Sequence, residues 1–210
     1  MSGKFRLVLF DVDSTLIEQE VIDLLANETN HGTQVSEITS RAMAGEINFD
    51  EALRERVALL RGLSEEVFAK VTKQISFSPG AIHLLSELKK RSIRVGAVSG
   101  GFFNVLNLLF KDLELDFLLA NTLEVNHGIL SGKVIGPIVN RAAKRQALFD
   151  FAEKFSIDIE QTVAVGDGAN DLDMIESAGL GVSYRGKQIL NDAADLLLTE
   201  PRLDLLLNYL

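Results

Sequence analysis

A short apolar run that ends in two carboxylates constrains this chain more than any other stretch. Residues 7–10 are Leu-Val-Leu-Phe, and Asp11 and Asp13 follow with one residue between them. An unbroken apolar run of this length is typical of a strand buried on both faces of a parallel sheet. Its end then lies at the carboxyl edge of the sheet, where open α/β folds bind ligands. Two carboxylates this close repel each other unless a cation or a shared proton relieves them, so the pair indicates a functional site, with an ordinary Asp- and Ser-containing turn as the alternative.

Strand and helix patterns alternate after residue 75. Strands are predicted at 93–98, 117–120, 162–165, 181–184 and 196–198, with a hairpin of 122–125 and 129–135 around Asn126-His127-Gly128. Helices are predicted at 82–88, 102–110, 142–155 and 172–178. This alternation predicts an α/β fold with a doubly wound, Rossmann-like parallel sheet.

Residues 16–75 have a different character, because apolar residues there recur with helical spacing and proline is absent. Four apolar stripes predict four short helices inserted after the first strand. We expect residues 16–75 to form a small helical cap domain over the carboxylate pair. Residues 1–15 and 76–210 then form the α/β catalytic core.

Composition excludes several classes of partner. The net charge of −9 at pH 7, without a convincing basic patch, argues against nucleic acid and acidic membrane surfaces. Cysteine is absent, which excludes disulfides and thiolate metal sites and permits a reducing cytosol. The first residues lack a secretory apolar region, and no apolar run approaches membrane-spanning length. We therefore expect a cytoplasmic monomer or homodimer that acts on a small molecule, with no nucleic-acid or membrane partner.

Polar groups also follow the strand predicted at 93–98. Ser99, Gly100 and Gly101 come directly after it and lead into a predicted helix. The Ser99 hydroxyl and the backbone N–H groups of the two glycines at a helix start are suited to hold an anion. If the strands are parallel, this cradle lies at the same sheet edge as Asp11 and Asp13.

A third carboxylate follows the strand predicted at 162–165, in the run from Gly166 to Asp171. Hard oxygen ligands from Asp11, Asp13 and Asp167 suit Mg²⁺, which binds through one or two carboxylates together with phosphate. The run does not match a dinucleotide-binding fingerprint, because Asp171 stands in place of the third glycine and would repel a pyrophosphate. The three polar segments together predict a site for Mg²⁺ and a phosphate group.

Three charged residues occupy positions where helical periodicity predicts apolar ones. Glu20 falls on the stripe of the first inserted helix, Arg56 on that of the third, and Lys144 on that of the helix at 142–155. Burying such a charge costs several kcal/mol unless it is paired or lies in a cleft, whereas a long side chain at the edge of a stripe can reach solvent instead. Opposite charges on Glu20 and Arg56 favour a cleft that grips a zwitterion. Met43 and Phe49 are more typical of core residues, but each stands at a helix end and can face the same cleft.

With these segments assembled, the sequence resembles the haloacid dehalogenase superfamily of aspartate-nucleophile phosphatases, and within it the phosphoserine phosphatases. The resemblance covers nearly the whole chain and is carried by several motifs. They are Asp11-Val12-Asp13-Ser14-Thr15-Leu16, Glu20, Arg41-Ala42-Met43 with Phe49, Leu53-Arg54-Glu55-Arg56-Val57, Ser99-Gly100-Gly101-Phe102, Ala143-Lys144 and Gly166-Asp167-Gly168-Ala169-Asn170-Asp171.

The resemblance implies an activity and a chemical role for each motif. Asp11 is implied to attack phosphorus and form an aspartyl-phosphate, and Asp13 to protonate the leaving group and then activate water. Mg²⁺ is implied to be held by Asp11, the Asp13 backbone carbonyl and Asp167. The remaining implied substrate-binding residues are Ser99, Gly100 and Lys144 for the phosphoryl group, Glu20 for the substrate ammonium, Arg56 for its carboxylate, and Met43, Phe49 and Asn170. Asp171 and Gly101 are implied in support, and Asn170 and Asp171 also to order the metal shell and the loop. The implied reaction is the hydrolysis of O-phospho-L-serine to L-serine and phosphate, the last step of serine biosynthesis.

The sequence departs from the family pattern in two places. The first strand begins near Arg6, without the N-terminal regulatory domain of many members, and the segment 181–188 lacks a proline often found there. Neither departure touches the chemical residues. The alternatives are a phosphatase or phosphotransferase for another small phosphate ester, a receiver-like signalling domain and a phosphate-binding module. A signalling domain would need neither the helical insertion nor Asp13.

Overall fold

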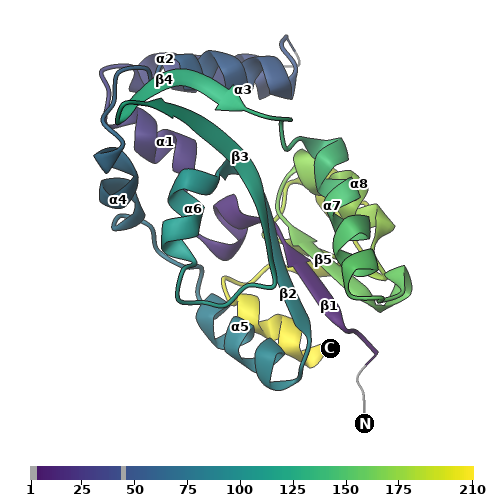
Figure 1. Ribbon diagram of the computed structural model, residues 1–210. Coiled ribbons are helices and arrows are strands. Elements are labelled where there is room, and N and C mark those ends of the chain that lie inside the picture. The colour runs from purple at the N-terminus through teal and green to yellow at the C-terminus, as the bar shows by residue number, and fades with distance from the viewer. Residues whose placement is uncertain (1–3, 44–45) are drawn as a thin grey trace.

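Seven strands form one sheet in the order β4-β3-β2-β1-β5-β6-β7 (Figure 1). The computed structural model describes residues 4–43 and 46–210, without the side chains of residues 40, 42 and 43. The strands are β1 Leu7–Phe10, β2 Arg94–Phe102, β3 Phe117–Asn126, β4 Ile129–Ile135, β5 Thr162–Gly166, β6 Leu180–Tyr184 and β7 Leu196–Leu198. All neighbouring strands are parallel except β3 and β4, which form the hairpin. The predicted α/β doubly wound sheet is confirmed.

Strand β1 lies in the middle of the sheet between β2 and β5, and all of its residues are buried. Its side chains alternate between two cores, with Val8 and Phe10 in one and Leu7 and Leu9 in the other. This is why the apolar run at the start of the chain is unbroken: the strand has no face toward water. Its carboxyl end is therefore fixed from both sides, and that end carries Asp11.

Helices cover both faces of the sheet (Figure 1). The first core includes residues of α5 (Ala81–Lys90) and α6 (Phe103–Leu109), and the second includes residues of α7 (Arg141–Lys154) and α8 (Leu172–Ser177). The remaining short elements are α9 Gln188–Asn191 and the helical turns η1 Val12–Leu16, η2 Ile159–Gln161, η3 Ala169–Asp171 and η4 Leu203–Asn208. Within the described ranges, no helix has both the length and the hydrophobicity needed to cross a membrane.

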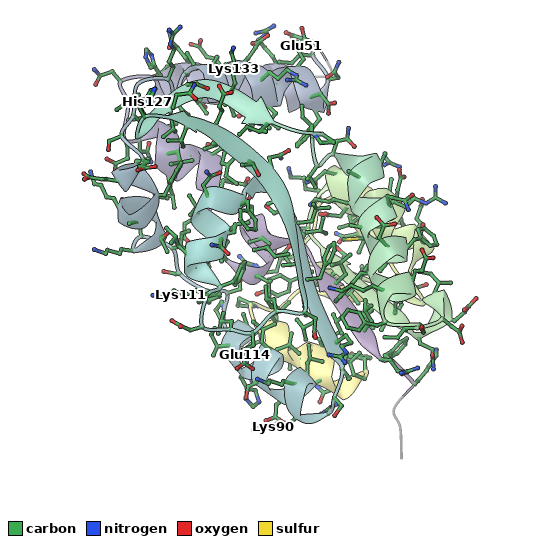
Figure 2. All side chains as sticks on the ribbon, viewed as in Figure 1. Glu51, Lys90, Lys111, Glu114, His127 and Lys133 are labelled. Atoms are coloured by element: carbon green, nitrogen blue, oxygen red, sulfur yellow. The ribbon has the colours of Figure 1, made fainter. Side chains whose placement is uncertain are left out.

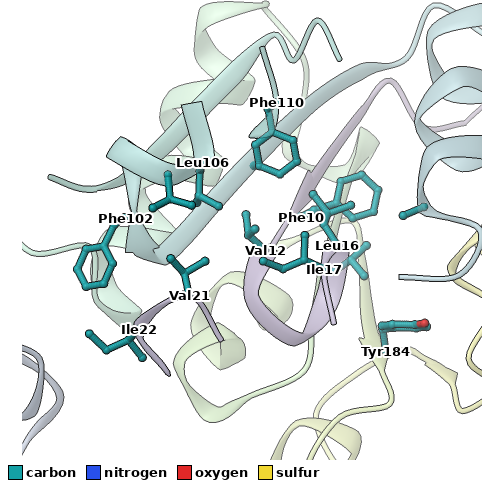
Figure 3. Packing of buried hydrophobic residues seen from close by; sticks show 14 of the residues in the cluster. Phe10, Val12, Leu16, Ile17, Val21, Ile22, Phe102, Leu106, Phe110 and Tyr184 are labelled. Carbon is teal, nitrogen blue, oxygen red and sulfur yellow. The ribbon is translucent and has the colours of Figure 1, made fainter. Parts of the chain in front are cut away.

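The turn after Asp11 is anchored by the first core. Val12 and Leu16 of η1 belong to the same cluster of buried residues as Phe10, Phe102 and Leu106 (Figure 3). Each fully buried apolar side chain of this size stabilises the fold by about 1.5–3 kcal/mol relative to an exposed one. The apolar side chains on both sides of Asp13 thus hold the polar end of β1 in place.

Two predicted boundaries are wrong. Strand β2 does not end at Val98 but continues through Ser99, Gly100 and Gly101 to Phe102, with a register shift where it pairs with β3. The two short strands predicted at 117–120 and 122–125 are one long strand, β3. A polar residue between apolar runs suggests a break, but Asn121 at that point is buried and the strand passes through it.

The four predicted inserted helices are present as α1 Val21–Ala26, α2 Gly32–Met43, α3 Phe49–Ala58 and α4 Glu66–Thr72. They stand beyond the carboxyl end of β1, and β4 runs alongside α3 (Figure 1). The hairpin is fastened to the connection between α3 and α4, because Leu130 N–H donates to the Leu63 carbonyl at 2.8 Å and Glu65 N–H to the Gly128 carbonyl at 2.9 Å. We propose that α1–α4, called the cap helices below, act as a cap on the core, and that this hairpin is their support.

Candidate active site

Asp11 stands directly after β1, and its N–H donates to the carbonyl of Val165 on β5 at 2.8 Å. The chain then turns sharply, with Ser14 in the left-handed region at φ 59°. A side chain in that region is strained, so the turn is held by the packing on either side of it. The turn places Asp11 and Asp13 at the same edge of the sheet, as the spacing predicts.

Lys144 joins Asp11 to Asp171 inside the protein. Its ammonium is completely buried, contacts Oδ1 of Asp11 and donates to Oδ1 of Asp171 at 2.6 Å. Burial opposes the charge of Lys144, but the two carboxylates outweigh it and raise the lysine pKa above its usual value. Lys144 therefore stays protonated. The alternative of a half-buried lysine that reaches solvent is wrong.

Asp171 uses both of its carboxylate oxygens within the protein. Oδ1 accepts from Lys144, and Oδ2 accepts from the N–H groups of Asp167 at 3.2 Å and Gly168 at 3.1 Å. The carboxylate passes so close to Gly166 that a Cβ there would lie 2.5 Å from Asp171 Cγ. The glycine is thus required for this approach, and Asp171 orders the loop that presents Asp167.

Three carboxylates are grouped closely enough to hold a metal ion: oxygen atoms of Asp11, Asp167 and Asp171 all lie within 4.8 Å of one another. Burial, with a contribution from Asp171, raises the pKa of Asp11 well above its usual value and that of Asp167 to about 6. Three carboxylates face the single ammonium of Lys144, so the group retains negative charge when ionised. An oxygen-rich, negatively charged set of this kind fits a hard divalent cation. Because both oxygens of Asp171 are engaged, Asp11 and Asp167 are the carboxylates left to bind it.

These pKa values predict how metal binding depends on pH. Raised folded-state pKa values mean that Asp11 and Asp167 contribute stability at low pH and lose it as the pH rises through those values, which for Asp167 is about 6. A divalent cation that binds only the ionised groups restores that loss. We expect Mg²⁺ to raise the unfolding temperature of EDTA-treated protein clearly at about pH 8 and little at about pH 5.

Differential scanning fluorimetry with and without Mg²⁺ at both pH values checks this expectation. Asp167→Asn should lose the shift at about pH 8. Asp192 is an exposed carboxylate directly after α9, and Asp192→Asn should keep the shift. An equal shift at both pH values, or a full shift in Asp167→Asn, would show that the cation binds elsewhere.

Asp13 has an environment different from that of Asp11. Its Oδ1 accepts from Val21 N–H at 3.2 Å, and its Oδ2 accepts from the Ser99 hydroxyl at 3.3 Å. Burial and the nearby carboxylate of Glu20 raise its pKa to about 7. A carboxyl group that titrates near neutrality can both give and take a proton, as general acid–base catalysis requires.

The segment Ser99–Gly101 is brought beside Asp13, but its groups differ from the expected cradle. Gly101 N–H donates to Ser99 Oγ at 2.7 Å, so that N–H is not available for an anion, which corrects the expectation. A Cβ on Gly101 would lie 2.5 Å from Asp13 Oδ2, and one on Gly100 would lie 3.1 Å from the ring of Phe49. The absence of a side chain at Gly101 therefore leaves room for the Asp13 carboxylate, and its absence at Gly100 leaves room for the Phe49 ring of α3.

Both predicted charges lie in the segment inserted after β1, but Glu20 is not on a helical stripe as expected. It precedes α1, is exposed, and its Oε1 accepts from the Ser14 hydroxyl at 2.7 Å. Arg56 is half-buried on α3; burial lowers its pKa, and the carboxylates of Asp23, Glu20 and Asp13 oppose the decrease. The guanidinium therefore lies in an acidic surrounding that includes Glu20 and Asp13.

Phe49, Asn170 and Met43 complete the predicted set. Phe49 opens α3 with its ring against Gly100, and Asn170 lies half-buried in η3. Met43 is the last residue of α2, and its side chain lies outside the described residues. Where these side chains meet a substrate stays a prediction.

Sequence reasoning missed two asparagines. Asn121 is buried, donates to the Gly100 carbonyl at 2.8 Å and accepts from Val139 N–H at 2.8 Å, which fixes the bent end of β2. Asn140 precedes α7 and accepts from Ala143 N–H at 3.2 Å. The available signals were an amide inside an apolar strand and an N-cap one turn before Lys144.

The family model of the haloacid dehalogenase-like hydrolases matches residues 8–176. A phosphoserine phosphatase of Streptococcus thermophilus is 47% identical over 203 residues, covering 97% of this chain and 94% of that one. The phosphoserine phosphatase of Methanocaldococcus jannaschii is 41% identical over the whole of both chains. Phosphoserine phosphatase SerB2 of Mycobacterium tuberculosis is 48% identical, but the chain spans only 49% of its length.

Solved structures of phosphoserine phosphatases also resemble this chain. A phospho-aspartyl intermediate analogue of phosphoserine phosphatase superposes with a TM-score of 0.91 at 41% identity, covering 99% of this chain and 100% of that one. A substrate-bound phosphoserine phosphatase complex superposes with a TM-score of 0.92 at 41% identity, covering 99% of both chains.

Proposed function

The chain belongs to the haloacid dehalogenase-like hydrolases and, within them, to the phosphoserine phosphatases, and on that premise we propose that it hydrolyses O-phospho-L-serine through an aspartyl-phosphate on Asp11. One observation carries the proposal: Asp11, paired with the buried ammonium of Lys144, stands beside Asp13, whose pKa is raised to about 7. A nucleophile with a fixed countercharge and an adjacent group that exchanges protons at neutral pH are the two parts that this reaction needs.

In the first step, a carboxylate oxygen of Asp11 forms a bond to phosphorus, and the bond from phosphorus to the seryl oxygen breaks. Protonated Asp13 gives its proton to that oxygen, so that L-serine leaves as an alcohol. In the second step, Asp13 takes a proton from a water molecule as the water oxygen attacks phosphorus. The bond to Asp11 breaks, phosphate leaves, and both carboxyl groups return to their initial states.

Charge controls whether Asp11 can act. Burial and Asp171 raise its pKa, whereas Lys144 lowers it. A Mg²⁺ ion held by Asp11, Asp167 and the Asp13 backbone carbonyl would lower it further and offset the repulsion between Asp11 and the phosphate dianion. The ammonium of Lys144 lies between Asp11 and Asp171. We therefore assign it mainly to the charge of the nucleophile Asp11, and only indirectly to the phosphoryl oxygens.

Substrate selection is assigned to the two charges of the cap side. The Ser14 hydroxyl donates to Oε1 of Glu20, and among the described residues no hydrogen bond engages its Oε2, which we assign to the substrate ammonium. Arg56, in its acidic surrounding, offers a planar donor pair that matches a carboxylate. We assign Ser99 and Gly100 to the phosphoryl group, and the ring of Phe49 lies against Gly100.

The experiment that tests this function compares phosphoserine with phosphoethanolamine, which has the same phosphate and ammonium but no carboxylate. Wild-type protein should prefer phosphoserine. Arg56→Ala should lower kcat/KM for phosphoserine by about 100-fold, the value of a charged hydrogen-bond pair, and change it little for phosphoethanolamine.

Arg54→Ala is the matched control, because Arg54 is exposed on the same helix and makes no side-chain contact assigned to the site. Phosphate release from both esters at saturating Mg²⁺ gives kcat/KM of each variant relative to wild type, which is four ratios for two variants and two esters. Equal losses on both esters in Arg56→Ala would refute the carboxylate role, and no release from phosphoserine by wild-type protein would refute the function.

A further inference from the structure

The first turn of α3 meets the first turn of α7 through one pair of side chains. Asn140 Nδ2 donates to Asp50 at 3.1 Å from Oδ1 and 3.4 Å from Oδ2. The other end of the same amide, Oδ1, accepts from Ala143 N–H at 3.2 Å and caps α7. A single asparagine therefore starts a core helix and grips a cap helix at the same time. Neither residue belongs to a motif that the proposed chemistry uses.

This pair is attached to the candidate site on both sides. On the cap side, Asp50 directly follows Phe49, whose ring lies against Gly100. On the core side, Lys144 N–H donates to the Asn140 carbonyl at 2.9 Å, one turn before the ammonium that contacts Asp11. A movement of the Asp50–Asn140 pair is thus a movement of Phe49 relative to the phosphoryl-binding segment.

The two ends of α3 are held in different ways. Beyond its carboxyl end, Gly62 N–H donates to the Leu130 carbonyl at 2.9 Å and Leu130 N–H to Leu63 at 2.8 Å, so backbone pairing fixes the helix to the hairpin. At its amino end the fastening is a side-chain amide on a half-buried carboxylate. Such a bond can break and re-form without disturbing the sheet, so the amino end of α3 has the weaker attachment.

We propose that Asp50 and Asn140 form a latch that holds the start of α3 over the Ser99–Gly101 segment and so positions Phe49 above the reacting phosphate. Both are positioning residues, because they act through Phe49 and touch no substrate. The kinetic consequence rests on the proposed phosphatase function. The latch itself rests on the geometry of α3 and α7, and can be tested without a substrate.

A purely structural role for Asp50 must be separated from this one, because an acid in the first turn of a helix also stabilises it through the helix dipole. Glu51 is the matched control: it is the next residue, also acidic and in the first turn, but exposed and pointing to the outside of the molecule (Figure 2). Glu51→Ala removes the same charge from the same turn and leaves Asn140 untouched.

The deciding variants exchange the two groups. Asn140→Asp keeps a good N-cap for α7 but sets two carboxylates against each other, so the latch opens. Asp50→Asn combined with Asn140→Asp restores an amide facing a carboxylate with the donor on the other side. We expect Asn140→Asp to lower kcat/KM for phosphoserine by about tenfold, the exchange pair to recover to within about threefold of wild type, and Glu51→Ala to stay within about twofold.

Amide hydrogen exchange of the peptide spanning residues 46–53 supplies a readout that needs no activity. It should accelerate about tenfold in Asn140→Asp, and return toward the wild-type rate in the exchange pair. An unaltered exchange rate in Asn140→Asp, or an exchange pair no better than the single variant, would overturn the latch. Faster exchange in Asn140→Asp, together with no phosphate release from phosphoserine by wild-type protein, would keep the latch and refute the proposed function.

Discussion

Asp11→Asn is expected to lower phosphoserine hydrolysis by on the order of 10⁴-fold or more, because an amide oxygen does not form the aspartyl-phosphate that divides the reaction into two steps. The residual reaction should show no initial burst of product, and no phosphorylated protein should form. Phosphate release at saturating substrate and Mg²⁺ measures the loss. Retention of more than about one per cent of wild-type activity would show that another group is the nucleophile.

The same variant is expected to fold. Asparagine has nearly the shape of aspartate, and Lys144 keeps its 2.6 Å contact with Asp171. Burial and Asp171 already raise the pKa of Asp11, so removing its charge relieves a crowded set of carboxylates. Asp150→Asn, a carboxylate on the exposed side of α7, is the matched control and should retain full activity. A melting temperature close to wild type in both variants separates lost chemistry from lost structure.

The position of Asp11 could be predicted because local sequence and global fold agree there. Residues 7–10 alternate between two buried cores, so their apolar run is unbroken, and the carboxyl end of a central parallel strand is a ligand-binding edge whatever follows it. The same reasoning placed Asp167 after β5. Strand topology alone therefore predicts that the carboxylates of Asp11 and Asp167 lie close together.

Lys144 shows where such reasoning stops. Periodicity could mark it as a charge on an apolar stripe, but its partner Asp11 lies 133 residues away in the sequence. Which carboxylates reach a buried ammonium depends on how α7 docks on the sheet, and the helix's own sequence does not contain that information. The prediction that Glu20 lies on a helical stripe is wrong for a related reason. The apolar spacing of the sequence extends to residues before α1, but at Glu20 the backbone is extended and the side chain accepts from the Ser14 hydroxyl.

The strand ends predicted within β2 and β3 are wrong because a polar residue in a local apolar pattern suggests the end of a strand. Ser99 and Asn121 are both buried within continuous strands, where each satisfies backbone groups of the bent segment at Gly100 and Gly101. A buried amide is tolerated when its donors and acceptors are all paired, and that pairing is tertiary. The departures from a simple strand pattern thus mark the functional edge of the sheet.

Asp13→Asn separates the two steps of the reaction, because Asp13 is proposed to donate a proton in the first and accept one in the second. With phosphoserine, whose leaving group needs that proton, we expect kcat to fall about 10³-fold. With p-nitrophenyl phosphate the leaving group departs without a proton, so the first step proceeds and the second, which still needs a base for water, stalls. The phosphorylated protein should then accumulate.

Intact-protein mass spectrometry after mixing with p-nitrophenyl phosphate and Mg²⁺ detects the added phosphoryl group. Asp13→Asn should carry it on Asp11, wild-type protein should show little because its intermediate is hydrolysed, and the double variant with Asp11→Asn should show none. The oxygen of an asparagine at position 13 can still accept from Val21 N–H, and its Nδ2 can donate to the Ser99 hydroxyl oxygen where Asp13 Oδ2 now accepts from it, so the turn after β1 is retained. If Asp13→Asn hydrolyses p-nitrophenyl phosphate at the wild-type rate without accumulating phosphoprotein, the base in the second step is a different residue.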